Sequence, residues 1–124
     1  MTIYVTHSSG FNYKNELYQP LRQSELNDFH HITLPYEHSV EPLSSKEYLK
    51  DCDLVLVAEV SYPSTGQGIE LGWADLYHLP IVCLYKQGMK LSRSLKVVAQ
   101  TFIEYENSED MVRKLSAHLS ASQF

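Results

Sequence analysis

The chain carries five short runs of apolar or β-branched residues, separated by longer segments in which apolar residues recur at helical spacing. Residues 53–60, Asp-Leu-Val-Leu-Val-Ala-Glu-Val, are almost continuously apolar, and residues 81–85 follow the same pattern. Strands that are covered on both faces have this composition, so we predict that these two runs are central strands of a parallel sheet. The five predicted strands are residues 3–6, 31–35, 53–60, 80–85 and 102–105.

The segments between the strands predict helices. Ser45 precedes Glu47, and Ser108 precedes Asp110, which is a typical start of a helix. The predicted helices are residues 13–25, 44–51, 65–79, 91–99 and 108–120. Strands that alternate with helices indicate βαβ units, so the predicted fold class is α/β: three layers around a five-stranded, mainly parallel sheet of flavodoxin-like or Rossmann-like type.

Composition sets the scale of the molecule and the kind of partner it can take. At 124 residues, with 44% hydrophobic and 20% charged residues, we expect one globular domain over residues 1–124. Fifteen acidic and ten basic residues leave a net charge of −5. That charge argues against a nucleic-acid polymer as partner, because such proteins normally present a basic face, but it leaves a small anion open.

The chain shows no sign of a membrane or secretory protein. The longest uncharged apolar run, residues 54–58, is far shorter than the roughly 20 residues that span a bilayer, so no membrane partner is expected. No basic segment precedes the first apolar run, so no signal peptide is expected either. We expect a cytoplasmic protein in which Cys52 and Cys83 are reduced thiols. The six histidines and two cysteines show no metal-binding spacing, so no metal is expected.

The segment of residues 61–72 carries the most informative pattern for function. Parallel sheets bind ligands outside the carboxyl ends of their strands, and this segment leads from a buried strand through a loop into a helix. Gly66 and Gly68 allow close approach of the backbone, Ser64 offers a hydroxyl, and the start of the helix offers free N–H groups, which together suit a phosphate. Glu70, which we place in the first turn of that helix, has two interpretations: an acid favoured by the helix dipole, or a carboxylate nucleophile. The loop of residues 36–42 is a second candidate wall of the site.

Residues 53–72 match the pattern Asp-(x)4-Ala-Glu-Val-x-x-Pro-Ser-x-Gly-x-Gly-x-Glu-Leu-Gly. In this the chain resembles the nucleoside 2-deoxyribosyltransferase superfamily, and within it the 2′-deoxynucleoside 5′-monophosphate N-glycosidase branch. The resemblance implies that Glu70 is the nucleophile that attacks the anomeric carbon of the sugar. It also implies substrate contacts from an aromatic residue on the first strand, from the loop that follows it, from serines at the phosphate and from a histidine near the base. The matching positions are Tyr4, Ser8, Ser9, Gly10, His38, Ser64, Gly66, Gly68 and Ser92.

Two positions depart from that branch. An arginine of the loop after the first strand is replaced here by Gly10, which removes a cation near the phosphate. An aspartate early in the helix before the third strand is replaced by Ser45. If that aspartate acts as a general acid, its loss should cost about 10²–10⁴-fold in rate.

The resemblance therefore implies an enzyme that hydrolyses the N-glycosidic bond of a 2′-deoxynucleoside 5′-monophosphate, or carries out a related deoxyribosyl transfer, through a covalent intermediate on Glu70. No cofactor is expected, and the Ser92 match implies a homodimer or higher oligomer, because that serine reaches a neighbouring subunit's site. A nucleotide-binding or sensor domain that has lost turnover is the alternative, favoured by Gly10 and Ser45. A flavodoxin-like or receiver-like signalling module is a weaker one. His7 lies in the ligand loop, and a catalytic and a structural role are equally open for it.

Overall fold

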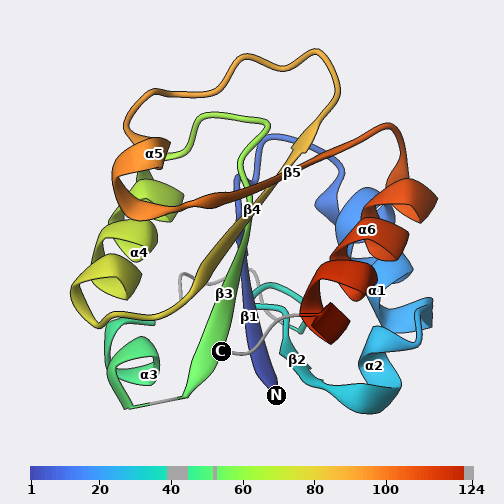
Figure 1. Ribbon diagram of the computed structural model, residues 1–124, viewed down its shortest axis with the longest axis horizontal. Helices are drawn as coiled ribbons and strands as arrows, with labels where there is room; N and C mark the ends of the chain where they lie inside the picture. Colours follow the sequence, from blue (N-terminus) through green and yellow to red (C-terminus); the bar gives the residue numbers. More distant parts are fainter. Residues whose placement is uncertain (39–44, 52, 122–124) are drawn as a thin grey trace.

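The computed structural model describes residues 1–38, 45–51 and 53–121. Its centre is a five-stranded sheet in which every neighbouring pair is parallel, in the order β2-β1-β3-β4-β5 (Figure 1). The predicted α/β fold class is confirmed. The strands are β1 Thr2–His7, β2 His31–Thr33, β3 Leu54–Glu59, β4 Ile81–Lys86 and β5 Thr101–Tyr105.

Helices cover both faces of the sheet and complete the three layers (Figure 1). Leu17 and Leu115 pack in the core on one face, and Leu49 and Leu71 pack in the core on the other. All six residues of β3 are buried, which is why its sequence is almost continuously apolar. The first face carries the π-helix η1 Lys14–Tyr18 with α1 Gln19–Gln23, α2 Leu26–Phe29 and α6 Ser108–Ala121; the second carries α3 Lys46–Asp51, α4 Thr65–Leu76 and α5 Leu95–Val98.

Several element boundaries differ from the sequence prediction. The predicted helix over residues 13–25 is divided into η1 and α1, with Pro20 in the first turn of α1. Proline has no N–H to donate to the preceding turn, so the regular helical pattern cannot run through it. Helix α4 ends at Leu76 and not at residue 79, because His78 adopts a left-handed conformation with φ of 59°. The predicted helix over residues 91–99 shortens to α5.

A buried carboxylate lies at the carboxyl end of the central strand. Glu59 has no exposed surface, and it accepts hydrogen bonds from the Ser61 backbone N–H at 2.7 Å, from the Ser61 hydroxyl at 3.0 Å and from the Tyr105 hydroxyl. Burial raises the pKa of the Glu59 carboxyl above its ordinary value. The side chain thereby joins the end of β3 to the end of β5.

The cysteine and membrane predictions can be compared with only part of the chain. Cys83 is a free thiol, fully buried in β4, and burial raises the pKa of this thiol to about 12. Cys52 lies outside the described residues. Among the helices described, none combines the length and apolar character needed to cross a bilayer.

Candidate functional site

The start of helix α4 is tied to the carboxyl ends of two strands. Ser64 caps the helix, because its hydroxyl oxygen accepts from the Gln67 backbone N–H at 3.2 Å. The buried Gln67 side chain then donates to the Thr6 carbonyl oxygen of β1 at 3.2 Å and to the Glu59 carbonyl oxygen of β3 at 2.7 Å. This anchor fixes the direction in which the next turn of α4 presents its side chains.

That next turn carries Glu70, whose carboxylate is held by three hydroxyl groups. Oε2 accepts from the Tyr4 hydroxyl at 2.8 Å and from the Ser45 hydroxyl at 2.5 Å, and Oε1 accepts from the Thr6 hydroxyl at 2.7 Å. The prediction that Glu70 lies in the first turn of its helix is wrong, since α4 begins at Thr65 and has no acidic residue in its first turn. Stabilisation by the helix dipole falls off beyond that turn and therefore does not explain this carboxylate.

The Tyr4 hydroxyl is a permanent donor in this arrangement. Tyr4 is buried in β1, and burial together with the adjacent Glu70 charge raises the pKa of its hydroxyl well above the ordinary range. The phenol therefore stays protonated at any physiological pH. Its O–H therefore holds the Glu70 carboxylate in one orientation.

Glu70 lines a cavity of about 350 Å³ at the carboxyl end of the sheet. Part of its wall is polar, formed by Tyr4, Ser9, Ser45, Ser64 and Glu70 itself, and part is apolar, with Pro35, Ile69 and Trp73. We call this space the Glu70 cavity. It combines one fixed carboxylate with several hydroxyl groups and an aromatic wall, a combination typical of a small-molecule site.

Ser8, Gly10 and His38, which the resemblance assigns to the substrate, do not line the Glu70 cavity. Ser8 is buried, and its hydroxyl oxygen accepts from the Gly10 backbone N–H at 3.0 Å and does not line the Glu70 cavity. Gly10 lies against Ser8, where an added Cβ would be 3.2 Å from the Ser8 hydroxyl oxygen. The side chain of His38 is 91% exposed, with Nε2 3.5 Å from Glu37. Residues 39–44, in the predicted loop wall, lie outside the described part of the chain.

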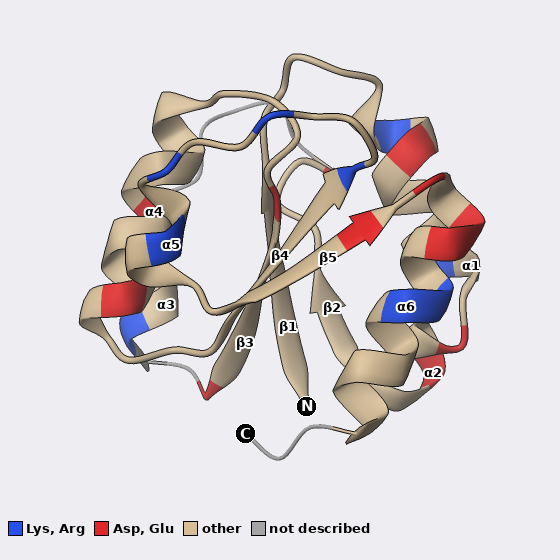
Figure 2. Ribbon diagram, turned by 45° about the horizontal axis from the view of Figure 1, so that its top comes forward, with Lys and Arg blue, Asp and Glu red and all other residues tan. Residues whose placement is uncertain are grey.

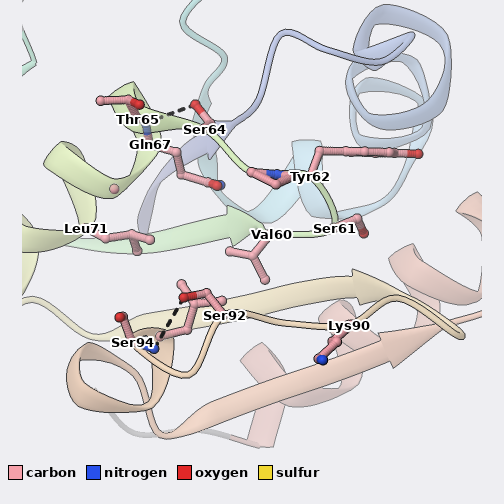
Figure 3. A pocket seen from close by; sticks show the side chains of 13 residues that line it. Val60, Ser61, Tyr62, Ser64, Thr65, Gln67, Leu71, Lys90, Ser92 and Ser94 are labelled. Carbon is pink, nitrogen blue, oxygen red and sulfur yellow. Dashed lines mark hydrogen bonds between the residues drawn. The ribbon is translucent and has the colours of Figure 1, made fainter.

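A second cavity, of about 380 Å³, lies on the other side of the start of α4. Figure 3 shows Ser64 and Gln67 on one side of it and Lys90, Ser92 and Ser94 on the other. We call it the Ser92 cavity. Gly66 lines the Glu70 cavity, whereas Gly68 lines the Ser92 cavity. Of the serines matched by the resemblance, Ser64 lines both cavities, Ser9 lines the Glu70 cavity, Ser92 lines the Ser92 cavity and Ser8 lines neither.

Sequence reasoning missed Thr6, Gln67 and the place of Trp73. Thr6 was available from the pattern, because it stands two residues after Tyr4 on one strand and therefore faces the same side of the sheet. Trp73 carries a similar signal, because it follows Glu70 by three residues on one helix, whereas the role of Gln67 depends on how α4 crosses the ends of β1 and β3.

His7 lines the Glu70 cavity, yet both of its ring nitrogens are occupied by the protein. Nδ1 lies 2.8 Å from the Ser8 carbonyl oxygen, which can only accept, so Nδ1 carries the proton. Nε2 therefore accepts from the Tyr18 hydroxyl at 2.6 Å, and that hydroxyl oxygen accepts from the Tyr36 backbone N–H at 3.1 Å. This series of hydrogen bonds joins two walls of the cavity and gives His7 a structural role.

We expect this histidine to make stability depend on pH. Burial lowers the pKa of His7 below its ordinary value, so the unfolded chain binds its proton more readily than the folded chain. The contribution of neutral His7 to the unfolding free energy is fully present above about pH 6.5, and it is lost as the pH falls through the pKa of His7 in the folded state. We expect the unfolding free energy, measured with urea between pH 7 and pH 5, to fall more in the wild type than in His7→Gln, by at most about 1.4 kcal/mol for each pKa unit of the shift.

The exposed His31→Gln variant is the matched control for this prediction. Parallel pH profiles of the wild type and His7→Gln would contradict it, because the proton uptake would then belong to other groups.

In the part of the chain that the structure describes, metal-binding groups do not gather around Glu70. Over residues 1–38, 45–51 and 53–121, no three histidine, cysteine, aspartate or glutamate side chains lie together as metal ligands would.

No family model matches the chain. Over 67 residues the chain is 36% identical to a putative 2′-deoxynucleoside 5′-phosphate N-hydrolase 1 of Syntrophotalea carbinolica, a match that covers 52% of this chain and 46% of that protein. The match thus spans about half the length of that curated relative.

The solved structure of the CMP N-glycosidase BcmB from Clostridium botulinum is similar over 94% of this chain and 99% of that one, with a TM-score of 0.66 and 20% sequence identity. The chain has the fold of this N-glycosidase. The α/β fold expected from the sequence is therefore the fold of a solved nucleotide N-glycosidase, and the local sequence match agrees with the resemblance described above.

Proposed function

We propose that the protein is a nucleotide N-glycosidase that cleaves the bond between base and sugar of a 2′-deoxynucleoside 5′-monophosphate. The observation that carries the proposal is the Glu70 carboxylate, fixed by the hydroxyls of Tyr4, Thr6 and Ser45 in the wall of a cavity. A carboxylate held in one orientation is the nucleophile that retaining glycosidases use. The names of the relative and of the structural neighbour, both N-glycosidases or N-hydrolases of nucleotides, favour an enzyme over the binding-only alternative.

The 5′-phosphate would lie at the start of α4. Backbone N–H groups in the first turn of a helix have no partner within it, and here they come from Thr65 and Gly66 next to the Ser64 hydroxyl. Ser9 lines the same cavity and offers a further hydroxyl. Binding of this kind uses neutral donors, which suits a chain of net charge −5 in which Gly10 stands at the position of the family's arginine.

The base would lie against the apolar wall. Trp73 follows Glu70 by three residues on α4 and therefore projects from the same face of the helix. Ile69, which is 49% exposed, borders the same space. A planar base between these side chains would place the anomeric carbon of its sugar toward the Glu70 carboxylate.

The reaction would then take two steps. A Glu70 oxygen forms an ester bond to C1′ while the C1′–N bond breaks, and its electron pair leaves with the base, which takes a proton from solvent. The negative carboxylate stabilises the positive charge that develops on the sugar in the transition state. Water then attacks C1′ and gives one proton to solvent while the bond from C1′ to the Glu70 oxygen breaks, which releases 5-phospho-2-deoxyribose and leaves Glu70 as a free carboxylate.

Ser45 would be a positioning residue in this reaction. Its hydroxyl donates to Glu70 from the position where the related branch has an aspartate. We expect Ser45→Ala to lower kcat by about tenfold with little change in KM, because a hydrogen bond to a charged group is lost while the substrate contacts remain. Steady-state kinetics of base release measure this, with Ser24→Ala, whose hydroxyl donates to the Leu21 carbonyl oxygen, as control. An unchanged kcat would mean that Ser45 does not orient the nucleophile.

The decisive assay is release of free base. We expect the purified protein, incubated with each of the four deoxynucleoside 5′-monophosphates, to yield free base and 5-phospho-2-deoxyribose from at least one, separated by chromatography. Tight binding of all four without release would overturn the proposal in favour of the sensor alternative.

A homodimer remains part of the proposal through the resemblance. There the serine matched by Ser92 completes a neighbouring subunit's site. In this chain Ser92 lies across a cavity from Ser64 of the same subunit. The Ser92 hydroxyl could therefore also contact a ligand bound by its own subunit.

A further inference from the structure

In the part of the chain that the structure describes, four titratable side chains line the Glu70 cavity: Tyr4, His7, Tyr36 and Glu70. No lysine or arginine of that part lines it, and helix α4, which forms one of its walls, carries acidic residues and no basic one (Figure 2). Tyr4 donates its proton to Glu70, and His7 donates its proton to a backbone carbonyl oxygen. Among these four, only Tyr36 carries a proton that no described residue accepts.

The ring of Tyr36 is nevertheless held in place. Its backbone N–H donates to the Tyr18 hydroxyl at 3.1 Å. The ring stands edge-on to His7, with the ring centroids 5.7 Å apart and the ring planes at 78°. Every buried side-chain polar atom of the described residues has a partner, so the unpartnered hydroxyl oxygen of Tyr36 is not buried. Packing thus fixes the side chain, and its O–H stays available to a ligand.

The Tyr36 hydroxyl lies near the nucleophile. Burial and the Glu70 charge raise the pKa of Tyr4, and Tyr36 adds a smaller part of that rise, which requires the two phenols to be near each other. Tyr4 itself is 2.8 Å from Glu70. Pro35 and Tyr36 border the cavity from the segment after β2, whereas Glu70 and Trp73 border it from α4. In a space of about 350 Å³, a base against Trp73 with its sugar at Glu70 is within reach of Tyr36.

We propose that Tyr36 is the proton donor to the leaving base. This inference rests on the proposed function and assigns a further catalytic residue to the same site. While Glu70 bonds to C1′ and the C1′–N bond breaks, the Tyr36 proton passes to the base, which leaves neutral, and Tyr36 becomes a phenolate. Water then attacks C1′ and gives a proton to this phenolate as the bond from C1′ to Glu70 breaks. Tyr36 is therefore the group through which the base obtains its proton from water.

The chemistry of a phenol suits both proton transfers. A phenol keeps its proton at neutral pH, so the donor is ready before the substrate binds. The phenolate forms when Glu70 has become a neutral ester, so the negative charges of Tyr36 and Glu70 are never present together. Ser45, at the position of the related branch's aspartate, does not suit this role, because a serine hydroxyl is a much weaker acid and already donates to Glu70.

The variant Tyr36→Phe keeps the ring that packs on His7 and removes only the hydroxyl. We expect it to lower the single-turnover rate of base release by about 10²–10⁴-fold, the usual contribution of general acid catalysis, with the urea midpoint of unfolding unchanged. Tyr13→Phe is the matched control. Tyr13 neighbours Tyr36, with ring centroids 6.2 Å apart, but does not line the Glu70 cavity, so this variant should behave as the wild type.

A substrate whose leaving group needs no proton separates acid catalysis from a structural role. In para-nitrophenyl 2-deoxyribose 5-phosphate the leaving group departs as the stable nitrophenolate anion, which is followed by its absorbance. We expect the wild type and Tyr36→Phe to release nitrophenolate at the same rate in a single turnover. Nitrophenolate release that slows by the same factor as base release would overturn the assignment, because the hydroxyl would then act on the site and not on the leaving group.

The outcomes also separate this inference from the proposed function. If the wild type releases base and Tyr36→Phe releases it equally fast, Tyr36 is not the donor and the N-glycosidase stands. If the wild type releases neither base nor nitrophenolate, both proposals fail together.

Discussion

Glu70→Gln is expected to reduce the rate of base release by about 10⁴-fold or more, because it removes the nucleophile and with it the covalent route. The amide has nearly the shape of the carboxylate, and hydroxyls can accept as well as donate. The three groups that face it, Tyr4, Thr6 and Ser45, can therefore turn to meet it. We accordingly expect the unfolding free energy of this variant to stay within about 1 kcal/mol of the wild type.

The measurement is single-turnover release of base by each protein, with urea unfolding as the check of the fold. Glu47→Gln makes the same chemical change on exposed α3 and should behave as the wild type. In the wild type, intact-protein mass spectrometry of acid-quenched reactions should show the mass of one phosphodeoxyribosyl group added at Glu70. Base release by Glu70→Gln at the wild-type rate would exclude this residue as the nucleophile.

Gln67→Met is expected to have the second largest effect, on both stability and activity. The methionine fills a similar volume but cannot donate, so the carbonyl oxygens of Thr6 and Glu59 lose the side chain that connects them. A buried polar group left without its partner costs about 1–3 kcal/mol, so we expect a loss of about 2–4 kcal/mol in unfolding free energy. Because the same anchor directs Glu70, kcat should also fall by more than tenfold.

Urea unfolding and steady-state kinetics measure the two effects separately. Gln23→Met, at an exposed position of α1, controls for the chemical change. If Gln67→Met unfolds at a lower urea concentration but keeps the wild-type kcat, the anchor serves the fold alone and does not position the nucleophile.

The centre of the sheet could be predicted from the sequence because its strands are buried on both faces, unlike the edge strands β2 and β5. Strands β3 and β4 are marked by near-continuous apolar runs, and these require no knowledge of their neighbours. The helices were harder where a local feature overrides the pattern. The pattern over residues 13–25 is that of one helix, yet Pro20 divides it, and the left-handed His78 ends α4 early.

The candidate site could be predicted only in part. Glu70 and Ser64 stand in one local segment whose residue types indicate a ligand, so they could be found there. The hydroxyl groups that hold Glu70 come from β1 and from the residue before α3, segments far apart in the chain. Ser45 was singled out as a departure from the related branch, but its contact with Glu70 depends on tertiary packing. His38 shows the opposite case, since its place in a motif did not bring its side chain to the cavity.

The Glu59–Tyr105 contact has a consequence for the order in which the molecule can form. Glu59 lies on the central strand β3. Tyr105, which donates to the Glu59 carboxylate, lies on β5, the last of the five strands to be synthesised. Until Tyr105 has left the exit tunnel, a nascent sheet would have to bury this carboxyl group without one of its three donors. The nascent chain therefore gains the full stability of the end of the sheet that carries the site only late in translation, which delays the moment at which it can first bind a ligand.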